Sequence, residues 1–537
     1  MAGPVEAELL ISGGTVADGT GARLRRAEIT VRSGRLAVLP EGARPPARRT
    51  VDASGLVVAP GFIDVHTHSD AITLIGAGAG EQAGALARAA VMQGVTTEIC
   101  GNCGSSLFPA LPERVAGMVP SARASFGGPV PIFTDYKGFA EAHIAVPRAN
   151  HLTSLVGHGT LRAGVLGYAD RPATPEELAV MCDLLDTALT QGAAGLSTGL
   201  IYTPGTYAGT EEVVALAKVA ARHGKPYVTH LRDEMSRVEE ALEEAVEIAR
   251  RSGAALHVSH HKTAGRHAWG RTLVTLPRIA SLRESGMDVT CDVYPYTAGS
   301  TMLSAMFPPW ANDGGVTALT ARLADPAERE RMRRSIAEGV PGWENTVGNG
   351  GWDRISVAGA VRNPEVEGRT IAELAAARAV DPLDLAAELL VAERGEVTII
   401  SHSMREDDVR RVLASPFAMI GSDGVPKPGH PHPRWAGTFP RVLGHYSRDL
   451  GLMPLETAVH KMTGMAAARF GLAGRGVIAG GAHADLVVFD PATVGDGATY
   501  AEPLLPPAGI HLVVAAGHIV VAGGADTGAR PGEVLTA

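Results

Sequence analysis

The chain has 537 residues, too many for one ordinary hydrophobic core, so we expect one large domain and at least one smaller module. Apolar residues make up 45% and charged residues 20% of the sequence, a balance typical of folded globular proteins. The net charge of −9, without any basic block, argues against nucleic acid as a partner. There is no apolar run of about 18 residues, so we expect no membrane span.

The first residues and the cysteines bear on the cellular compartment. Residues 1–8 lack the basic start and apolar core of a signal peptide, so we expect a cytoplasmic protein. Four cysteines are too few for a disulfide scaffold in so long a chain. They are Cys100, Cys103, Cys182 and Cys291.

Short β-like runs broken by glycine and proline fill residues 7–59. The run from Ala27 to Leu39 alternates well enough to predict a hairpin with a glycine turn. Similar β-like runs return after Arg469. We therefore expect residues 1–59 and 470–537 to form one small β-sandwich module built from both chain ends.

From residue 60 onward, short apolar strands alternate with amphipathic helices. The segment Thr174 to Glu177 predicts a capped helix start, and residues 238–250 carry one apolar stripe. Repeated β-then-α units imply an α/β fold with a parallel sheet, and about eight units predict a (β/α)8 TIM-like barrel over residues 60–469. The strands are expected at 62–66, 95–100, 152–157, 194–199, 226–230, 255–260, 288–294 and 417–422.

One stretch interrupts this alternation. Residues 305 to about 395 are rich in helical pattern, and residues 325–334 are highly charged. We interpret this stretch as an insertion near the last barrel strands. Residues 397–402 then form one strand too many, which belongs either to the insertion or to an irregular last unit.

The stretch from Pro60 to Asp70 carries the first candidate site residues. Residues 62–65 predict a short buried strand, and His66 and His68 follow at its end. Side chains two apart on a strand point the same way, so both imidazoles can bind one metal ion such as zinc. Taken alone, the pair has a simpler explanation as surface histidines in a turn.

Other strand ends are rich in metal-binding and acid/base residue types. In a barrel of this kind, active residues lie at the carboxyl ends of the strands, so these side chains converge on one mouth. They are Cys103 after the second strand, His230 at the end of the fifth, His260 and His261 at the end of the sixth, and Asp423 after the last.

Each of these residues has an alternative explanation. Cys100 and Cys103 form a C-x-x-C that fits a redox pair, but a Cys103 thiolate facing the histidines is the simpler hypothesis. His230 fits a core histidine and Asp423 a turn residue. Adjacent strand residues face opposite ways, so at most one of His260 and His261 is a direct ligand. Other histidines near strands are interpreted as packing or supporting residues: His158, His257 and His402.

The ordered set of motifs resembles the amidohydrolase superfamily and, within it, the N-acyl-D-amino-acid deacylases, or D-aminoacylases. A single H-x-H is weak, but the matches run in order over nearly the whole chain, which makes the set highly specific. They are 61–68 (GFIDVHTH), 94–97 (GVTT), 101–104 (GNCG), 195–200 (GLSTGL), 229–234 (THLRDE), 259–262 (SHHK), 292–296 (DVYPY), 299–301 (GST), 422–424 (SDG), 460–465 (HKMTGM) and 484–490 (ADLVVFD).

The resemblance implies a zinc-dependent hydrolase that splits the amide bond of small N-acyl-D-amino acids, giving a carboxylate and a free D-amino acid. It implies one tightly bound zinc and a second, weaker position. The implied ligands are Cys103, His230 and His260 for the tight zinc, and His66 and His68 with Cys103 as a bridge for the weaker one. Asp423 matches the catalytic acid/base, and the substrate-binding positions match Tyr202, Lys262, Ser300 and Arg434. The insertion resembles a lid.

The chemistry of these residues is consistent with amide hydrolysis. Zinc lowers the pKa of bound water toward about 7 and polarises a carbonyl. Asp423 would take the proton of the water and deliver a proton to the leaving amine. Tyr202 would stabilise the oxyanion, while Lys262 and Arg434 offer cations for the substrate carboxylate.

Two other functions fit parts of the pattern. One is an amidohydrolase acting on a cyclic, hydantoin-like amide or another acylated metabolite, and the other is a metal-free scaffold protein with this fold. The preference for D over L substrates comes from the resemblance alone. The sequence predicts neither the preferred side chain and acyl group, nor the number of zinc ions, nor the oligomeric state.

Overall fold

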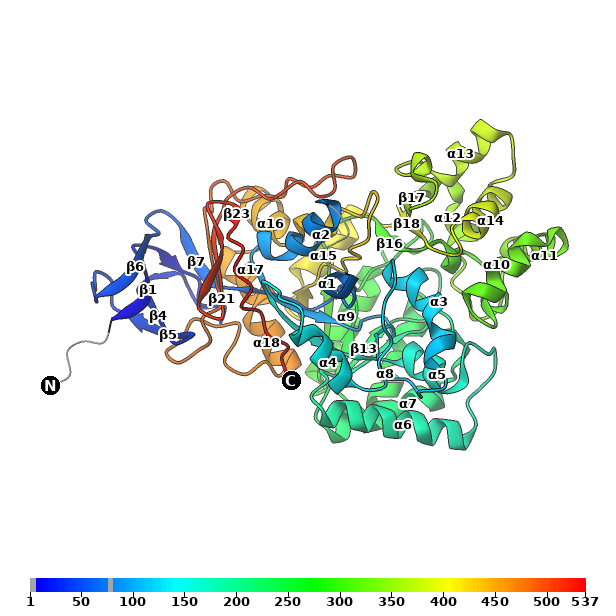
Figure 1. The fold of residues 1–537 in the computed structure, drawn as a ribbon, viewed down its shortest axis with the longest axis horizontal. Coiled ribbons are helices and arrows are strands. Elements are labelled where there is room, and N and C mark those ends of the chain that lie inside the picture. Colours follow the sequence, from blue (N-terminus) through cyan, green and yellow to red (C-terminus); the bar gives the residue numbers. More distant parts are fainter. Residues whose placement is uncertain (1–5, 76–80) are drawn as a thin grey trace.

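The computed structural model of the protein describes residues 6–75 and 81–537. Three parts lie along its long axis: strands from both chain ends, a centre of strands and helices, and a helical segment that projects from it (Figure 1). Residues 1–5, part of the stretch on which the prediction of a missing signal peptide rests, lie outside the described residues. None of the described helices combines the length and apolar character that a membrane span requires.

Short parallel strands occupy the centre at all eight predicted places, and two of them, β10 and β11, share the predicted place 152–157. Their residues are buried on both faces, as expected for a parallel sheet covered by helices. Their hydrogen bonds define two sheets, with strand orders β10-β9-β8 and β11-β12-β13-β14-β15-β19. The strands are β8 (Phe62–Asp64), β9 (Val95–Cys100), β10 (His151–Ser154), β11 (Val156–Gly157), β12 (Leu196–Gly199), β13 (Tyr227–His230), β14 (Leu256–Val258), β15 (Val289–Val293) and β19 (Ala418–Ile420).

The two sheets adjoin at both of their sides. Only Leu155 separates β10 from β11, and its N–H donates to the carbonyl oxygen of Cys100 at 2.9 Å. Just past β8 and β19, Thr67 and Gly424 form an isolated parallel bridge.

Amphipathic helices follow the strands along the chain. The predicted capping box opens α6, where the Thr174 hydroxyl accepts from the N–H of Glu177 and the Glu177 carboxylate accepts from the N–H of Thr174. Helix α8 buries its apolar stripe and ends at Gly253 in a left-handed conformation. The helices are α1 (Ile72–Ile75), α2 (Glu81–Met92), α3 (Val115–Phe126), α4 (Tyr136–Ile144), α5 (His158–Leu166), α6 (Pro175–Thr190), α7 (Thr210–Arg222), α8 (Val238–Ser252), α9 (Thr272–Glu284), α15 (Glu406–Ala414), α16 (Arg434–Arg441), α17 (Leu455–Met462) and α18 (Gly464–Phe470).

The segment between β15 and β19 has its own antiparallel sheet, of order β16-β18-β17, and its own apolar cluster. Because β18 pairs with both neighbours there, residues 397–401 belong to this segment and not to the parallel strands. The segment begins earlier than the sequence predicts, at Gly299. Its elements are β16 (Gly299–Met302), α10 (Val316–Ala324), α11 (Pro326–Glu338), α12 (Thr346–Gly350), β17 (Ile355–Ala360), α13 (Ile371–Arg378), α14 (Pro382–Ala392) and β18 (Val397–Ser401).

Strands from both chain ends form two further sheets, seen together in blue and red in Figure 1. One has the order β5-β4-β1-β6, and the other, β23-β22-β21-β20-β7-β2-β3, joins the two ends of the chain. An apolar cluster with members from both sheets includes Ile29, Val58 and Leu486. The strands are β1 (Ala7–Ser12), β2 (Thr15–Val16), β3 (Arg25–Arg26), β4 (Glu28–Arg32), β5 (Arg35–Leu39), β6 (Ala47–Asp52), β7 (Val57–Pro60), β20 (Leu486–Phe489), β21 (Ile510–Ala515), β22 (His518–Ala522) and β23 (Ala525–Asp526).

Residues 532–537 return to the central strands. Val534 forms a parallel bridge with Leu152, and the N–H of Leu535 donates to the carbonyl oxygen of Leu152 at 2.7 Å. The side chains of Leu535 and Ala537 pack against an apolar cluster to which strands of both parallel sheets contribute. This segment therefore covers apolar residues of the centre of the fold.

Candidate active site

The strand ends bring the predicted ligands together. His66 follows β8, Cys103 follows β9, His230 ends β13 and His260 follows β14, while Asp423 follows β19. Their potential ligand atoms form two groups, each with atoms within 4.8 Å of one another: His66, His68, Cys103 and Asp423 in one, and Cys103, His230 and His260 in the other.

Cys103 belongs to both groups. Its Sγ lies 3.3 Å from His66 Nε2 and 3.3 Å from His260 Nε2. Burial raises the pKa of the Cys103 thiol, but the neighbouring His66 and His260 lower it well below its ordinary value. A buried thiolate between imidazoles is a donor set that zinc prefers.

His230 gives an independent test of whether the residues fit a metal. The residue is buried, yet neither of its ring nitrogens has a hydrogen bond. Its Nε2 is 3.4 Å from the carboxylate of Glu234. Because buried polar atoms are rarely left without partners, an imidazole of this kind beside a thiolate fits a metal ligand.

Three site residues have left-handed backbone conformations although they are not glycines. The φ angles are 50° for Cys103, 34° for His260 and 50° for Asp423. Such conformations cost about 1–3 kcal/mol and concentrate at functional sites. The adjacent histidines face different partners: His260 Nε2 lies 3.3 Å from Cys103 Sγ, whereas the His261 ring pairs with the hydroxyl of Thr275 at 2.8 Å.

Asp423 lies between the histidines and a buried arginine. One carboxylate oxygen is 3.2 Å from His68 Nε2, and the other is 2.9 Å from Arg434 Nη1. Burial raises the pKa of Asp423, but the charges of Arg434, His260 and His66 lower it well below its ordinary value. The carboxylate is therefore ionised, and it belongs to the group that contains His66, His68 and Cys103.

The two predicted cations are engaged within the site. Lys262 Nζ lies 2.7 Å from the Glu234 carboxylate and 2.7 Å from His260 Nδ1. The guanidinium of Arg434 stacks on the Tyr294 ring at 4.5 Å, and its Nη2 donates to the backbone carbonyl of Ser300 at 3.2 Å. Ser300 thus contacts Arg434 through its backbone.

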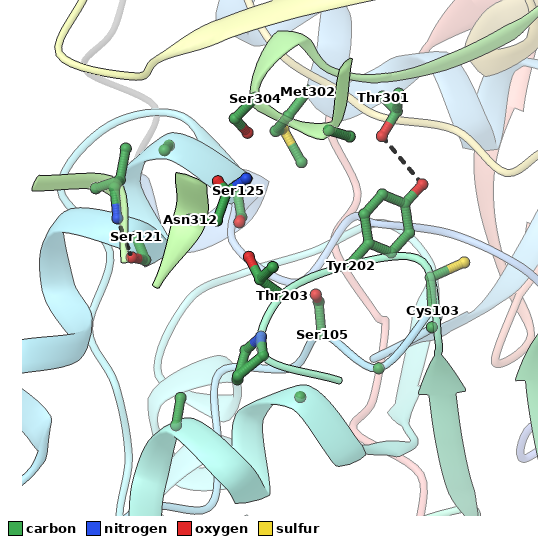
Figure 2. Close-up of a pocket in the computed structure, with 18 of the residues that line it drawn as sticks. Cys103, Ser105, Ser121, Ser125, Tyr202, Thr203, Thr301, Met302, Ser304 and Asn312 are labelled. Atoms are coloured by element: carbon green, nitrogen blue, oxygen red, sulfur yellow. Dashed lines mark hydrogen bonds between the residues drawn. The ribbon is translucent and has the colours of Figure 1, made fainter. Parts of the chain in front are cut away.

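Tyr202 points toward the insertion (Figure 2). The hydroxyl of Thr301 donates to the phenolic oxygen of Tyr202 at 3.0 Å, which leaves the phenolic proton free for another acceptor. Burial, with the nearby Cys103, raises the pKa of Tyr202 well above its ordinary value. The phenol therefore stays protonated and can donate a hydrogen bond.

A cavity of about 160 Å³ extends from these residues between α3, the loop after β12 and the start of the insertion. His68, Cys103, Tyr202 and Asp423 line its inner end. Its remaining wall is apolar or carries hydroxyl and amide groups, some of which Figure 2 labels. Among the described residues, neither Lys nor Arg lines it. The larger wall side chains are Met118, Phe126, Ile132, Tyr168, Ile201, Met302, Phe307, Val316 and Trp343.

Sequence reasoning missed three acidic residues at the site. Glu234 contacts His230, His260 and Lys262, and Asp292 contacts the ring of His66. Glu344, from the insertion, accepts the backbone N–H of Glu234 at 2.5 Å. Glu234 and Asp292 lie inside the THLRDE and DVYPY motifs, so they were visible as residues, whereas nothing in the sequence connects Glu344 to the site.

Comparison with known proteins gives the same family as the sequence motifs. Residues 49–521 match the amidohydrolase family. The chain is 41% identical to D-aminoacylase of Alcaligenes xylosoxydans xylosoxydans over 98% of its length and 97% of that protein. It is 38% identical to N-acyl-D-aspartate deacylase of the same organism over 99% of its length and 95% of that protein.

A solved structure supports the same family. N-acyl-D-glutamate deacylase from Bordetella bronchiseptica, complexed with zinc and a phosphonate inhibitor that mimics the tetrahedral intermediate, superposes with a TM-score of 0.83 at 38% identity, covering 99% of this chain and 100% of that one. The fold and site thus define a metal-dependent hydrolase of the α/β class. The chain belongs to the amidohydrolase family.

Proposed function

We propose that the protein is a zinc-dependent deacylase of N-acyl-D-amino acids with neutral, largely apolar side chains. Its relatives include enzymes named for D-aspartate and D-glutamate substrates as well as a D-aminoacylase. The choice among these substrate classes rests on the cavity wall, where no Lys or Arg of the described part of the chain is found. A buried carboxylate side chain without a cation would lose several kcal/mol of solvation.

In this proposal, Cys103, His230 and His260 hold the tight zinc, and His66 and His68 share Cys103 for the weaker position. The donor types and the unpartnered ring of His230 support the assignment. When bound there, zinc supplies a Lewis acid that activates water and polarises the amide carbonyl.

The protein's own residues move the proton and bind the substrate. Asp423, kept ionised by Arg434, accepts a proton from the attacking water and returns it to the amine nitrogen as the C–N bond breaks. Tyr202 donates a hydrogen bond from its phenolic O–H to the oxygen of the tetrahedral intermediate and keeps its proton. The substrate carboxylate binds beside Ser300, where Arg434 and Lys262 supply positive charge.

We also propose that the two parallel sheets are one closed (β/α)8 barrel. The Leu155 link and the bridge between Thr67 and Gly424 support closure. Residues 60–469 would form this domain, interrupted by an insertion that we extend to 299–401, and residues 1–59 and 470–537 the small β module. A reducing cytoplasm would suit the free Cys103 thiol.

A substrate panel tests the function. Zinc-loaded protein is assayed for amine release from the N-acetyl derivatives of leucine, methionine, aspartate and glutamate, each in D and L forms. Turnover of D-leucine and D-methionine derivatives, with little on the acidic ones, is the expected result. Preference for the acidic derivatives would refute the cavity argument. Turnover of a hydantoin in place of all linear amides would favour the cyclic-amide alternative.

A designed cation makes the test sharper. Ser304→Arg places a guanidinium on the cavity wall, and Ser54→Arg places one on an exposed site of the β module. A charge-assisted hydrogen bond contributes about 1.5–3 kcal/mol. Ser304→Arg should therefore raise kcat/KM for the D-glutamate derivative relative to D-leucine by about 10–100-fold, while the control should leave the ratio unchanged.

A further inference from the structure

A buried carboxylate of β15 reaches both metal groups without belonging to either. Asp292 opens the DVYPY motif, and its side chain is 0% exposed. Its Oδ2 lies 3.3 Å from His66 Nδ1 and 2.9 Å from His257 Nε2. Its Oδ1 accepts the backbone N–H of His260 at 2.9 Å. One carboxylate thus collects three N–H groups.

The Asp292 carboxylate sets the direction of these hydrogen bonds, because an ionised carboxylate can only accept them. The Thr290 hydroxyl lies 2.8 Å from His257 Nδ1 and can donate to it. The proton of a neutral His257 is then on Nε2, which faces Asp292. A carboxylate only accepts, so His66 must likewise carry its proton on Nδ1.

The tautomer of His66 determines whether its other ring nitrogen, Nε2, is available to a metal. In a neutral His66, Nε2 then carries the lone pair, and this atom lies 3.3 Å from Cys103 Sγ and 3.4 Å from Asp423 Oδ1, within the first metal group. The hydrogen bond on one ring nitrogen decides which nitrogen binds a metal.

We propose that Asp292 is a positioning residue of the metal centre. It fixes the tautomer of His66 at the weaker position and holds the backbone of His260, whose φ is 34°, at the tight position. One side chain thereby orients a ligand of each position. The inference rests on the metal positions proposed above.

Asparagine has the shape of Asp292 but not its hydrogen-bonding capacity. With the amide NH2 toward His66, two donors would face each other unless His66 moved its proton to Nε2, which removes the metal-binding lone pair. With the amide reversed, the NH2 would face the N–H of His260. Either orientation leaves one ligand misdirected.

The experiment compares zinc binding of wild type, Asp292→Asn and Asp485→Asn by competition with a chromophoric chelator. Asp485 is a matched control, because it is buried and its Oδ1 holds the ring of His151 at 3.0 Å, outside both metal groups. Loss of a hydrogen-bonding partner of a metal-bound histidine lowers metal affinity by about 10–100-fold. That loss is expected for Asp292→Asn, whereas Asp485→Asn should lower the thermal midpoint and keep wild-type zinc affinity.

The outcomes separate this inference from the proposed function. Wild-type protein that binds no zinc refutes the metal positions and this inference with them. Zinc affinity of Asp292→Asn equal to that of wild type refutes the inference alone. If the variant does not fold, neutron diffraction of zinc-loaded wild type decides: a deuteron on His66 Nδ1, between the ring and Asp292, is expected, and a bare Nδ1 overturns the role.

Discussion

Gly199, the last residue of β12, packs directly against the turn that carries Cys103. A Cβ at Gly199 would lie 2.7 Å from the carbonyl carbon of Cys103, closer still to its oxygen, and 2.9 Å from Tyr202 Cδ2. Ordinary carbon contacts need about 3.5–4.0 Å, so the Cys103 backbone would have to move by about 1 Å. Zinc–ligand distances tolerate about 0.2 Å, so this shift is several times what the ligand can absorb.

Gly199→Ala should therefore weaken zinc binding and lower kcat/KM by about 100-fold, the effect of a displacement of about 1 Å at a catalytic site. Overpacking should also remove about 1–3 kcal/mol from the free energy of unfolding. Zinc content after dialysis, steady-state kinetics and thermal melting measure these effects.

Gly480→Ala is the matched control. An added Cβ at Gly480 meets nothing within 4 Å, so its stability should stay within about 0.5 kcal/mol of wild type and its zinc content should not change. Gly199→Ala protein with wild-type zinc content and turnover would refute the reasoning that the β12 end positions Cys103.

Three further predictions concern single side chains. Asp423→Asn should keep tight zinc but lose at least about 100-fold in kcat; full turnover would remove the acid/base role. Arg434→Lys should lower kcat/KM by about 10–100-fold for substrates with a free carboxylate and much less for their methyl esters, since the ammonium cannot form a bidentate pair; equal losses on both would contradict carboxylate binding. Burial and the nearby Glu234 raise the pKa of Glu344 from 4.5 to about 7. The folded state therefore holds this proton more tightly than the unfolded state. Wild type should lose up to about 3 kcal/mol of stability as pH rises from 4.5 to about 7. Glu344→Gln should remove this loss. If the thermal midpoints of wild type and variant change equally between about pH 5 and pH 8, Glu344 does not cause a pH-dependent loss of stability.

The sequence predicted the parallel strands and the residues at their ends because both follow from local pattern. Apolar runs mark strands that are buried on both faces, and the carboxyl ends of parallel strands share one side of a sheet. His66, Cys103, His230, His260 and Asp423 could therefore be placed together without knowing any side-chain position.

Contacts that depend on where a side chain or backbone group points could not be predicted from local pattern. Ser300 meets Arg434 through its backbone carbonyl, which its residue type does not reveal. Glu234 and Glu344 are 110 residues apart, and no local pattern connects them. The left-handed turn at His260 is also set by tertiary contacts, among them the hydrogen bond from its backbone N–H to Asp292.

Residues 532–537 have a consequence for how the chain is made. The ribosome completes all the parallel strands, ending with β19, long before it adds Leu535 and Ala537, which cover apolar residues at the centre of the fold. Until then, Ile63, Ile99 and Val228 have no cover from that segment. The packing of this apolar cluster is therefore completed only when the last residues of the segment are in place.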